Sequence, residues 1–379
     1  MEHLATQLPE IVSHILSFLI ANYSQEDQKK KLYADLYPCL FVNRLWHDWT
    51  IRAMWRNVAF EDTKADLDKF LKFASIIYNE PIPTSTKTPI EYVDQPEYLK
   101  AEYTILPETL LSKIEENDVL QQEQYQLVEP TRLKTYRHSM RSLSVRKIKE
   151  KSVNEPLSKI GQTASKLEHL DIYICDYFSS DALYPFLVHR QLTYLSLAGC
   201  HHISDEAVLK VAEYCDRLEH LDLRACGLVS DVSLSAIALN CPQLRHLNVG
   251  RIRDREKVTT KSIGLIAKHT QASVLGLAGC DIDDECLKLL AMYRTTGLER
   301  VSANGCFKIS NKTVYAFLRY CPNLSVFEMK ECHLISDWEA VAELVQRKVL
   351  LTLCDQQSRA CTDWARVRGR TLDVRAPLK

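Results

Sequence analysis

The chain has 379 residues, 46% of them apolar, and its 48 Lys and Arg against 49 Asp and Glu give a formal net charge of −1. So small a charge creates no general attraction to nucleic acid or to an anionic membrane, and we expect neither as a partner. Because no apolar run could span a bilayer and no basic secretion signal opens the chain, we expect a protein of the cytoplasm or nucleus.

The first predicted element is an apolar helix over residues 8–19. It is followed by the segment 32–60, which carries three tryptophans. So short a segment cannot bury this much apolar surface alone, and the surface left exposed usually marks a partner site. We therefore expect a small helical unit that binds a partner. The alternative is that this unit caps the open edge of the repeats that follow.

This segment, assigned to a domain over residues 1–62, resembles an F-box. LPEI at 8–11, VNRLW at 42–46 and MW at 54–55 match the family pattern, while the polar insertion at 21–31 departs from it. The resemblance implies docking on the Skp-type adaptor of a cullin–RING ubiquitin ligase, although the insertion could perturb that surface. By position it assigns the adaptor contacts, or the fold behind them, to Leu8, Pro9, Ile15, Leu16, Leu19, Leu40, Val42 and Trp46.

The next two segments differ in character. Residues 63–80 have apolar side chains at helical spacing and predict a connecting helix. Residues 81–130 are first rich in Pro and Thr and then polar and acidic, which predicts a flexible insertion or linker.

A repeat occupies residues 131–354. Its opening reads L-x-x-L-x-L-x-x-C in LTYLSLAGC (192–200) and LEHLDLRAC (218–226), and related openings recur every 25 to 28 residues from residue 140, with a degraded one at 350. A turn of the type Ile-Ser-Asp and an amphipathic helix complete each unit. A single strand–turn–helix unit cannot bury both of its apolar faces, but stacked units can.

These units resemble the cysteine-containing leucine-rich repeats, and they are also similar to those of the antagonist-of-mitotic-exit-network group. The resemblance implies an α/β fold: a horseshoe-shaped solenoid with an inner parallel sheet and outer helices, preceded by the small all-α F-box. Residues 355–379 predict either a cap on the last repeat or a solvated tail.

The thirteen cysteines mostly occupy two repeat positions, the strand exit and the helix end. The chain has no CxxC pair, which argues against zinc, and a chain without a secretion signal is not expected to form disulfides. We therefore expect two ladders of buried thiols and no metal or cofactor. Ile252 at the strand exit of one repeat suits an apolar role there.

Side chains that flank the strand leucines should point into the concavity, because strand side chains alternate. They form the predicted protein-binding face: His169, Asp171, Tyr173, Tyr194, Ser196, His220, Asp222, Arg224, His246, Asn248, Arg251 and Arg300. The alternative is an ordinary hydrated face. The charged loop at 251–257 is a second candidate contact, and the His–Asp rows lack a neighbouring nucleophile for hydrolysis.

The combination of an F-box-like segment with cysteine-type repeats predicts a non-catalytic receptor. The F-box would bind the adaptor, and the repeats would hold a protein substrate for ubiquitin transfer and proteasomal degradation. The alternative is a repeat scaffold that sequesters a cell-cycle or signalling regulator without ligase function.

Overall fold

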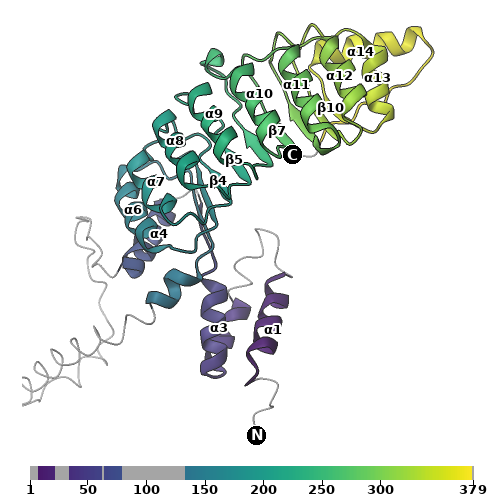
Figure 1. Cartoon of the computed structure of the whole chain (residues 1–379). Coiled ribbons are helices and arrows are strands. Elements are labelled where there is room, and N and C mark those ends of the chain that lie inside the picture. Colours follow the sequence, from purple (N-terminus) through teal and green to yellow (C-terminus); the bar gives the residue numbers. More distant parts are fainter. Residues whose placement is uncertain (1–6, 22–33, 62–63, 79–132, 378–379) are drawn as a thin grey trace, which may run out of the picture. The chain divides into compact units, whose positions relative to one another are not determined.

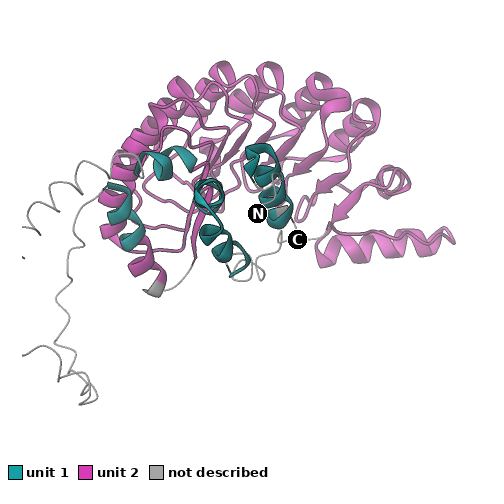
Figure 2. Cartoon of the chain, turned by 90° about the horizontal axis from the view of Figure 1, so that it is seen from below, with its two compact units in different colours: residues 1–55, 71–139 teal, residues 56–70, 140–379 magenta. Residues whose placement is uncertain are grey.

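The computed structural model describes residues 7–21, 34–61, 64–78 and 133–377. The chain divides into two compact units: residues 1–55 with 71–139, and residues 56–70 with 140–379 (Figure 2). The predicted insertion at 81–130 lies outside the described residues. Within them, no helix is both long and apolar enough to cross a bilayer.

The second unit is built on one parallel sheet whose ten strands follow chain order, each bonded to the next. Successive strands pair in register, so that Leu170, Leu195 and Leu221 lie side by side. The strands are β1 (Asn57–Glu61), β2 (Ser142–Arg146), β3 (His169–Tyr173), β4 (Tyr194–Ser196), β5 (His220–Asp222), β6 (His246–Asn248), β7 (Val274–Gly276), β8 (Arg300–Ser302), β9 (Val326–Glu328) and β10 (Leu350–Thr352).

One helix follows most strands, and these helices cover one face of the sheet along the outer side of an arc (Figures 1 and 2). We call the opposite face of the sheet the concave face. The helices are α6 (Asn154–Thr163), α7 (Ser180–Leu187), α8 (Asp205–Tyr214), α9 (Asp231–Asn240), α10 (Thr260–His269), α11 (Asp284–Arg294), α12 (Asn311–Tyr320), α13 (Trp338–Gln346) and α14 (Asp355–Val367).

The core lies between the sheet and these helices. The strand leucines face the apolar stripes of the helices, such as Val208 and Val211 of α8, and all of these side chains are fully buried. Each buried leucine or valine contributes about 1.5–3 kcal/mol through removal from water. The predicted solenoid of strand, turn and helix is therefore the observed architecture.

The sheet begins earlier in the sequence than predicted. Strand β1, placed by the sequence reading in the first helical domain, pairs in register with β2, for example Val58 with Leu143. Its sequence NVAFE carries no leucine pattern, and its pairing partner lies about eighty residues further along the chain. Local pattern cannot reveal such a pairing, because tertiary context selects the partner.

Each turn before a helix joins two repeats. The Ser230 hydroxyl accepts a hydrogen bond from the Val232 N–H and caps its own helix. The following aspartate instead reaches the next repeat: Asp231 accepts hydrogen bonds from the N–H and hydroxyl of Thr259 and from the hydroxyl of Ser262. Asp205 and Asp284 make the same three contacts one repeat onward. These carboxylates fix the stacking distance of the repeats.

The first unit is a small helical cluster. It contains α1 (Pro9–Ala21), the 3₁₀ helix η3 (Tyr37–Phe41), α3 (Arg44–Met54) and the later turns of α4 (Lys64–Tyr78). Val12, Leu16 and Leu36 form its buried core, with Trp46 and Trp49 packed against it. Asn43 caps α3 through a bond from the Trp46 N–H.

A second layer of this unit is aromatic. The Trp55 ring stacks on Tyr136 and on Phe73, with ring centroids 4.3 and 5.5 Å apart. In the same unit, Arg137 Nε donates to the carbonyl oxygen of Ile77. The closing tryptophan of the F-box-like pattern is thus held inside the unit.

The C-terminal segment caps the last repeat. Cys361 and Ala365 of α14 are buried, and Gln357 Nε2 donates to the carbonyl oxygens of Met329 and Cys332. Beyond the helix, the Leu351 N–H of β10 donates to the Arg375 carbonyl oxygen. The free edge of β10 is therefore partly occupied by the chain itself.

Candidate functional site

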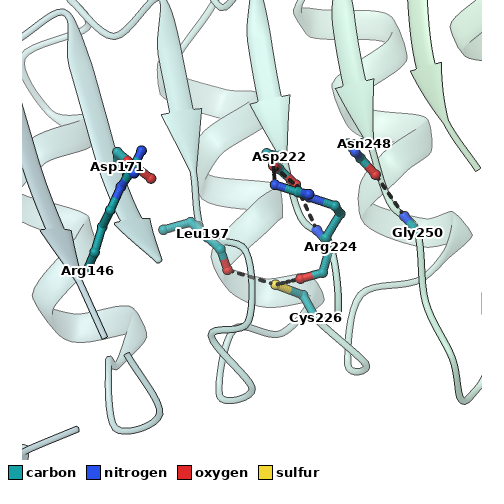
Figure 3. Close-up of polar contacts among 8 residues, drawn as sticks. All are labelled: Arg146, Asp171, Leu197, Asp222, Arg224, Cys226, Asn248 and Gly250. Carbon is teal, nitrogen blue, oxygen red and sulfur yellow. Dashed lines mark hydrogen bonds and ion pairs between the residues drawn. The ribbon is translucent and has the colours of Figure 1, made fainter. Parts of the chain in front are cut away.

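The cysteines are structural. All thirteen are free thiols, and those at the strand exits donate to main-chain carbonyls of the preceding strand, as Cys226 Sγ does to Leu197 at 3.1 Å (Figure 3). Burial raises the pKa of Cys226 and of Cys241 to about 12, which keeps both thiols protonated and unreactive. The described residues contain no cluster of three or more His, Cys, Asp or Glu side chains placed to hold a metal ion.

One step of the strand-exit ladder differs from the prediction. Ile252 is 87% exposed, whereas Arg251 is 6% exposed and takes the inner position. The Arg251 guanidinium donates to the carbonyl oxygens of Val229 and Asp254, and its Nε donates to Val249. The assignment of Ile252 to the core was therefore wrong, and Arg251 is buried where the prediction left it open to a partner. The Arg251 N–H donates to the Ala278 carbonyl oxygen as the Ala225 N–H donates to that of Gly250, so the main chain keeps the repeat register up to Arg251. The chain leaves the repeat path in the longer turn that follows, where Asp254 is in a left-handed conformation.

The remaining predicted residues do lie on the concave face. Those that are at least partly open to solvent are His169, Tyr173, Tyr194, His220, Arg224, His246, Asn248 and Arg300. Asp171, Ser196 and Asp222 lie on the same face but are 3–5% exposed. The prediction placed these three correctly on the face, but it missed that neighbouring side chains cover them.

The first row of this face is a column of stacked rings. His169, Tyr194, His220 and His246 come from four adjacent strands, with successive ring centroids 3.7, 4.0 and 3.9 Å apart and nearly parallel planes. The in-register pairing of β3 to β6 places the rings at this spacing. Stacking and burial exclude water from the ring faces and leave only the ring edges to a partner.

Burial also keeps the imidazoles neutral. It lowers the pKa of His220 to about 3, helped by the neighbouring His246 and His169. The pKa values of His169 and His246 are lowered as well, chiefly by burial, and Asp171 and Asp222 respectively offset part of that effect. Near neutral pH the column therefore offers uncharged donors and acceptors.

Ion pairs form the next rows. Asp171 accepts from Arg146 Nε at 2.8 Å, and Asp222 accepts from Arg224 Nε at 2.9 Å (Figure 3). At the other end, Glu328 pairs with Arg300 and accepts from the hydroxyl of Ser302. The sequence reading missed Arg146, although it occupies the same repeat position in MRSLSVRKI as Arg224 does in LEHLDLRAC.

The ring column ends at a hollow of about 640 Å³ over β4 to β9. Its floor contains the small residues Gly250, Gly276 and Ala278, and the Asn248 side chain lies over Gly276. His246 and Arg224 stand on one side of it, and Arg300 stands on the other. The hollow therefore separates two guanidinium groups of the concave face.

A separate surface lies on the first unit. Helix α1 exposes Leu8, Ile11, Ile15 and Phe18 along one stripe, while Val12 and Leu16 face the core. Of the predicted adaptor residues, Leu8, Pro9, Ile15 and Val42 are exposed, Leu16 is core, and Leu19, Leu40 and Trp46 are half-buried. Tyr37 and Phe41 add exposed rings that the sequence reading did not name.

Comparison with known proteins agrees with this architecture. The leucine-rich-repeat family matches residues 188–212, which contain β4 and most of α8. The chain has the fold of a leucine-rich-repeat solenoid.

Curated relatives match more of the chain than the family model does. The chain is 28% identical over 363 residues to antagonist of mitotic exit network protein 1 of Eremothecium gossypii, covering 93% of this chain and 76% of the relative. The proteins of the same name from Yarrowia lipolytica and Candida glabrata are 41% and 32% identical, over 46% and 48% of this chain but only 24% and 36% of their own lengths. Among solved structures, a chain in the yeast Rad7 and Elc1 complex aligns at 17% identity and a TM-score of 0.48, over 59% of this chain and 56% of that one.

Proposed function

We propose that this leucine-rich-repeat protein is a non-catalytic substrate receptor of an SCF-type ubiquitin ligase. Its first unit would dock on a Skp-type adaptor and through it on a cullin–RING ligase, and its concave face would hold a protein substrate. Catalysis would then be positional, since the receptor raises the concentration of a substrate lysine near the charged ubiquitin carrier.

The observation that carries the adaptor half is the two-sided helix α1. A surface helix normally has one apolar stripe, and one that is apolar on both sides is buried on both sides. Val12 and Leu16 account for one stripe, whereas Leu8, Ile15 and the 65% exposed Phe18 belong to the other. A helical partner that covers this second stripe would remove the exposed surface from water.

Co-purification with a Skp-type adaptor tests this half. We expect wild type to retain the adaptor and Ile15→Arg to lose it, because a guanidinium would be buried against an apolar partner. Leu239→Arg is the matched control, since Leu239 is an exposed leucine of the outer helix α9. Failure of wild type to bind the adaptor would refute the ligase assignment.

A second candidate is a scaffold that sequesters a regulator without ubiquitin transfer. The name shared by the curated relatives, antagonist of the mitotic exit network, favours it, because binding alone can antagonise a regulator. Proteasome inhibition separates the two candidates. A bound client should accumulate on inhibition if the chain is a ligase receptor, and its level should stay constant if the chain only sequesters it.

A further inference from the structure

On the concave face, acidic and basic side chains pair with one another, but the basic member of a pair is more exposed than the acidic member. Each of three ion pairs places its carboxylate beneath its guanidinium. The Asp171 side chain is 4% exposed against 42% for Arg146, Asp222 is 7% against 52% for Arg224, and Glu328 is 15% against 41% for Arg300. At these three pairs a partner therefore meets the guanidinium groups, because their carboxylates are covered; Glu61 of β1, beside Arg146, is 41% exposed and lies away from the hollow.

The other polar groups that a partner meets are hydrogen-bonding ring edges. In the part of the chain that the structure describes, no hydrogen bond engages the ring nitrogens of His220 and His246 or the Tyr194 hydroxyl. Arg224 uses Nε and Nη2 for its aspartate and Arg300 uses Nη2 for its glutamate, which leaves N–H donors on both. The face therefore has more open donors than its formal charge suggests.

The hollow lies between two of these guanidiniums. Arg224 follows β5 and Arg300 opens β8, and the floor between them contains Gly250, Gly276 and Ala278, with the Asn248 side chain over Gly276. Ile252 adds an exposed apolar side chain to the lining. The exposed carboxylates Glu168, Glu219 and Glu299 precede their strands and do not line this hollow.

We propose that the hollow binds an extended acidic segment of a protein partner, with two carboxylates engaging Arg224 and Arg300 and an apolar side chain between them in the hollow, beside Ile252 and Ala278. Carboxylates accept paired bonds from guanidinium groups, which favours this chemistry over a basic or purely apolar segment. This proposal specifies the ligand of the substrate-binding half of the proposed function, and it rests on that function for the partner's role. The peptide site itself can be tested independently of the ligase assignment.

Strand spacing fixes the register of such a segment. Three strand steps separate β5 from β8, about 14 Å at the usual spacing of parallel strands, and an extended chain advances about 3.4 Å per residue. Arg300 is level with His220, four residues before Arg224, but the two guanidiniums pair with Asp222 and Glu328, which lie in one row across the strands. Carboxylates about four residues apart, placed along this row, would therefore reach both arginines. In an extended chain, residues i, i+2 and i+4 point to the same side, so the middle residue faces the floor.

The test uses the full-length chain and short fluorescein-labelled peptides in fluorescence anisotropy. The first peptide has Asp and Glu four residues apart with Leu midway, the second replaces both acids by Lys, and the third moves the acids to a spacing of three. We expect the first peptide to bind at least about tenfold more tightly than the others, with an affinity that weakens in high salt.

Variants assign the binding to the hollow. Arg300→Gln should lower the affinity about tenfold, whereas Arg319→Gln, an exposed arginine of the outer helix α12, should not change it. Because Arg224→Gln would leave the buried Asp222 without its partner, the double change Arg224→Gln with Asp222→Asn replaces it and should weaken binding to the same extent.

Equal binding of the acidic and basic peptides overturns the proposal, and so does unchanged binding by both concave-face variants. A phosphoserine peptide that binds where the carboxylate peptide does not would also overturn it in favour of a phosphate site. Adaptor co-purification in parallel separates the two proposals. Adaptor retention without peptide binding refutes only this inference, and peptide binding without adaptor retention refutes only the ligase function.

Discussion

The strongest test of how the repeats are held together is removal of one inter-repeat carboxylate. Asp205, at the start of α8, accepts bonds from the Ser230 N–H at 2.8 Å and from the hydroxyls of Ser230 and Ser233 at 2.5 Å. These serines belong to the next repeat, and Ser233 is completely buried. The substitution Asp205→Ala removes all three bonds and leaves the Ser233 hydroxyl without its carboxylate.

The expected cost is about 3 kcal/mol. A buried donor without a partner costs about 1–3 kcal/mol, and the two partly exposed Ser230 groups recover part of their bonding from water. Urea unfolding followed by circular dichroism measures the loss, and hydrogen exchange should show it concentrated in α8 and α9, because repeats are stabilised by their neighbours. The serine hydrogen bonds lower the pKa of Asp205 despite its burial, so the carboxylate's contribution is present above its unfolded pKa and is lost as pH falls below about 4.

Glu206→Ala is the matched control. Glu206 is the next residue in the same first turn of α8, but it is exposed. Its removal takes away the same charge near the helix N-terminus and should cost less than about 0.5 kcal/mol. Equal losses for the two variants would mean that only the helix dipole matters, and the inter-repeat role of Asp205 would be refuted.

Three further predictions concern the concave face and the thiols. Because the pKa of His220 falls to about 3 on folding, only the unfolded chain binds a proton at this residue between about pH 3 and 6.5, and the free energy of unfolding should decrease from pH 7 to pH 5. The decrease should be about 1 kcal/mol smaller in His220→Phe than in wild type. The same decrease in both proteins would contradict a buried neutral imidazole. Gly276→Ala should destabilise the fold by about 1 kcal/mol, because the new Cβ would lie 2.3 Å from the Asn248 side chain. Gly264→Ala in helix α10, where the nearest atom belongs to Leu289 at 3.7 Å, should instead stabilise the fold. Changes of the same sign in the two melting temperatures would count against the close approach at Gly276. Iodoacetamide should modify the half-buried Cys354 in the native chain well before Cys226 or Cys241, as followed by peptide mass spectrometry, and early labelling of Cys226 would show that its thiol is not held in the ladder.

Much of the solenoid could be predicted from the sequence alone. Residues that recur at one position of a repeat meet the same surroundings in every copy, so the pattern of leucines at 192, 195 and 197 predicts both the strand and its buried side. The same reasoning placed His169, Tyr194, His220 and His246 on one face. The two thiol positions and the degraded last repeat at Leu350, which is β10, followed as well.

The tertiary structure decided what the pattern could not express. Strand β1 has no repeat signature, and only the presence of β2 beside it makes it a strand. Residue counting placed Ile252 in the core, but the longer turn after Arg251 leaves Ile252 at the surface, and the Arg251 side chain is buried instead. Asp171 and Asp222 looked like open ligands, yet Arg146 of the neighbouring strand β2 covers the first and Arg224, just after β5, covers the second.

One physical reason separates what the sequence determines from what the tertiary structure decides. Repeat position fixes the backbone direction and the side on which each side chain stands, and these are local properties that recur with the sequence. Which side chains remain open to a partner depends on their neighbours in adjacent strands, some 25 residues away in the chain. The sequence therefore determined the scaffold and the face, while the exposed guanidiniums, the neutral ring column and the hollow at Gly276 arise only when the repeats are stacked.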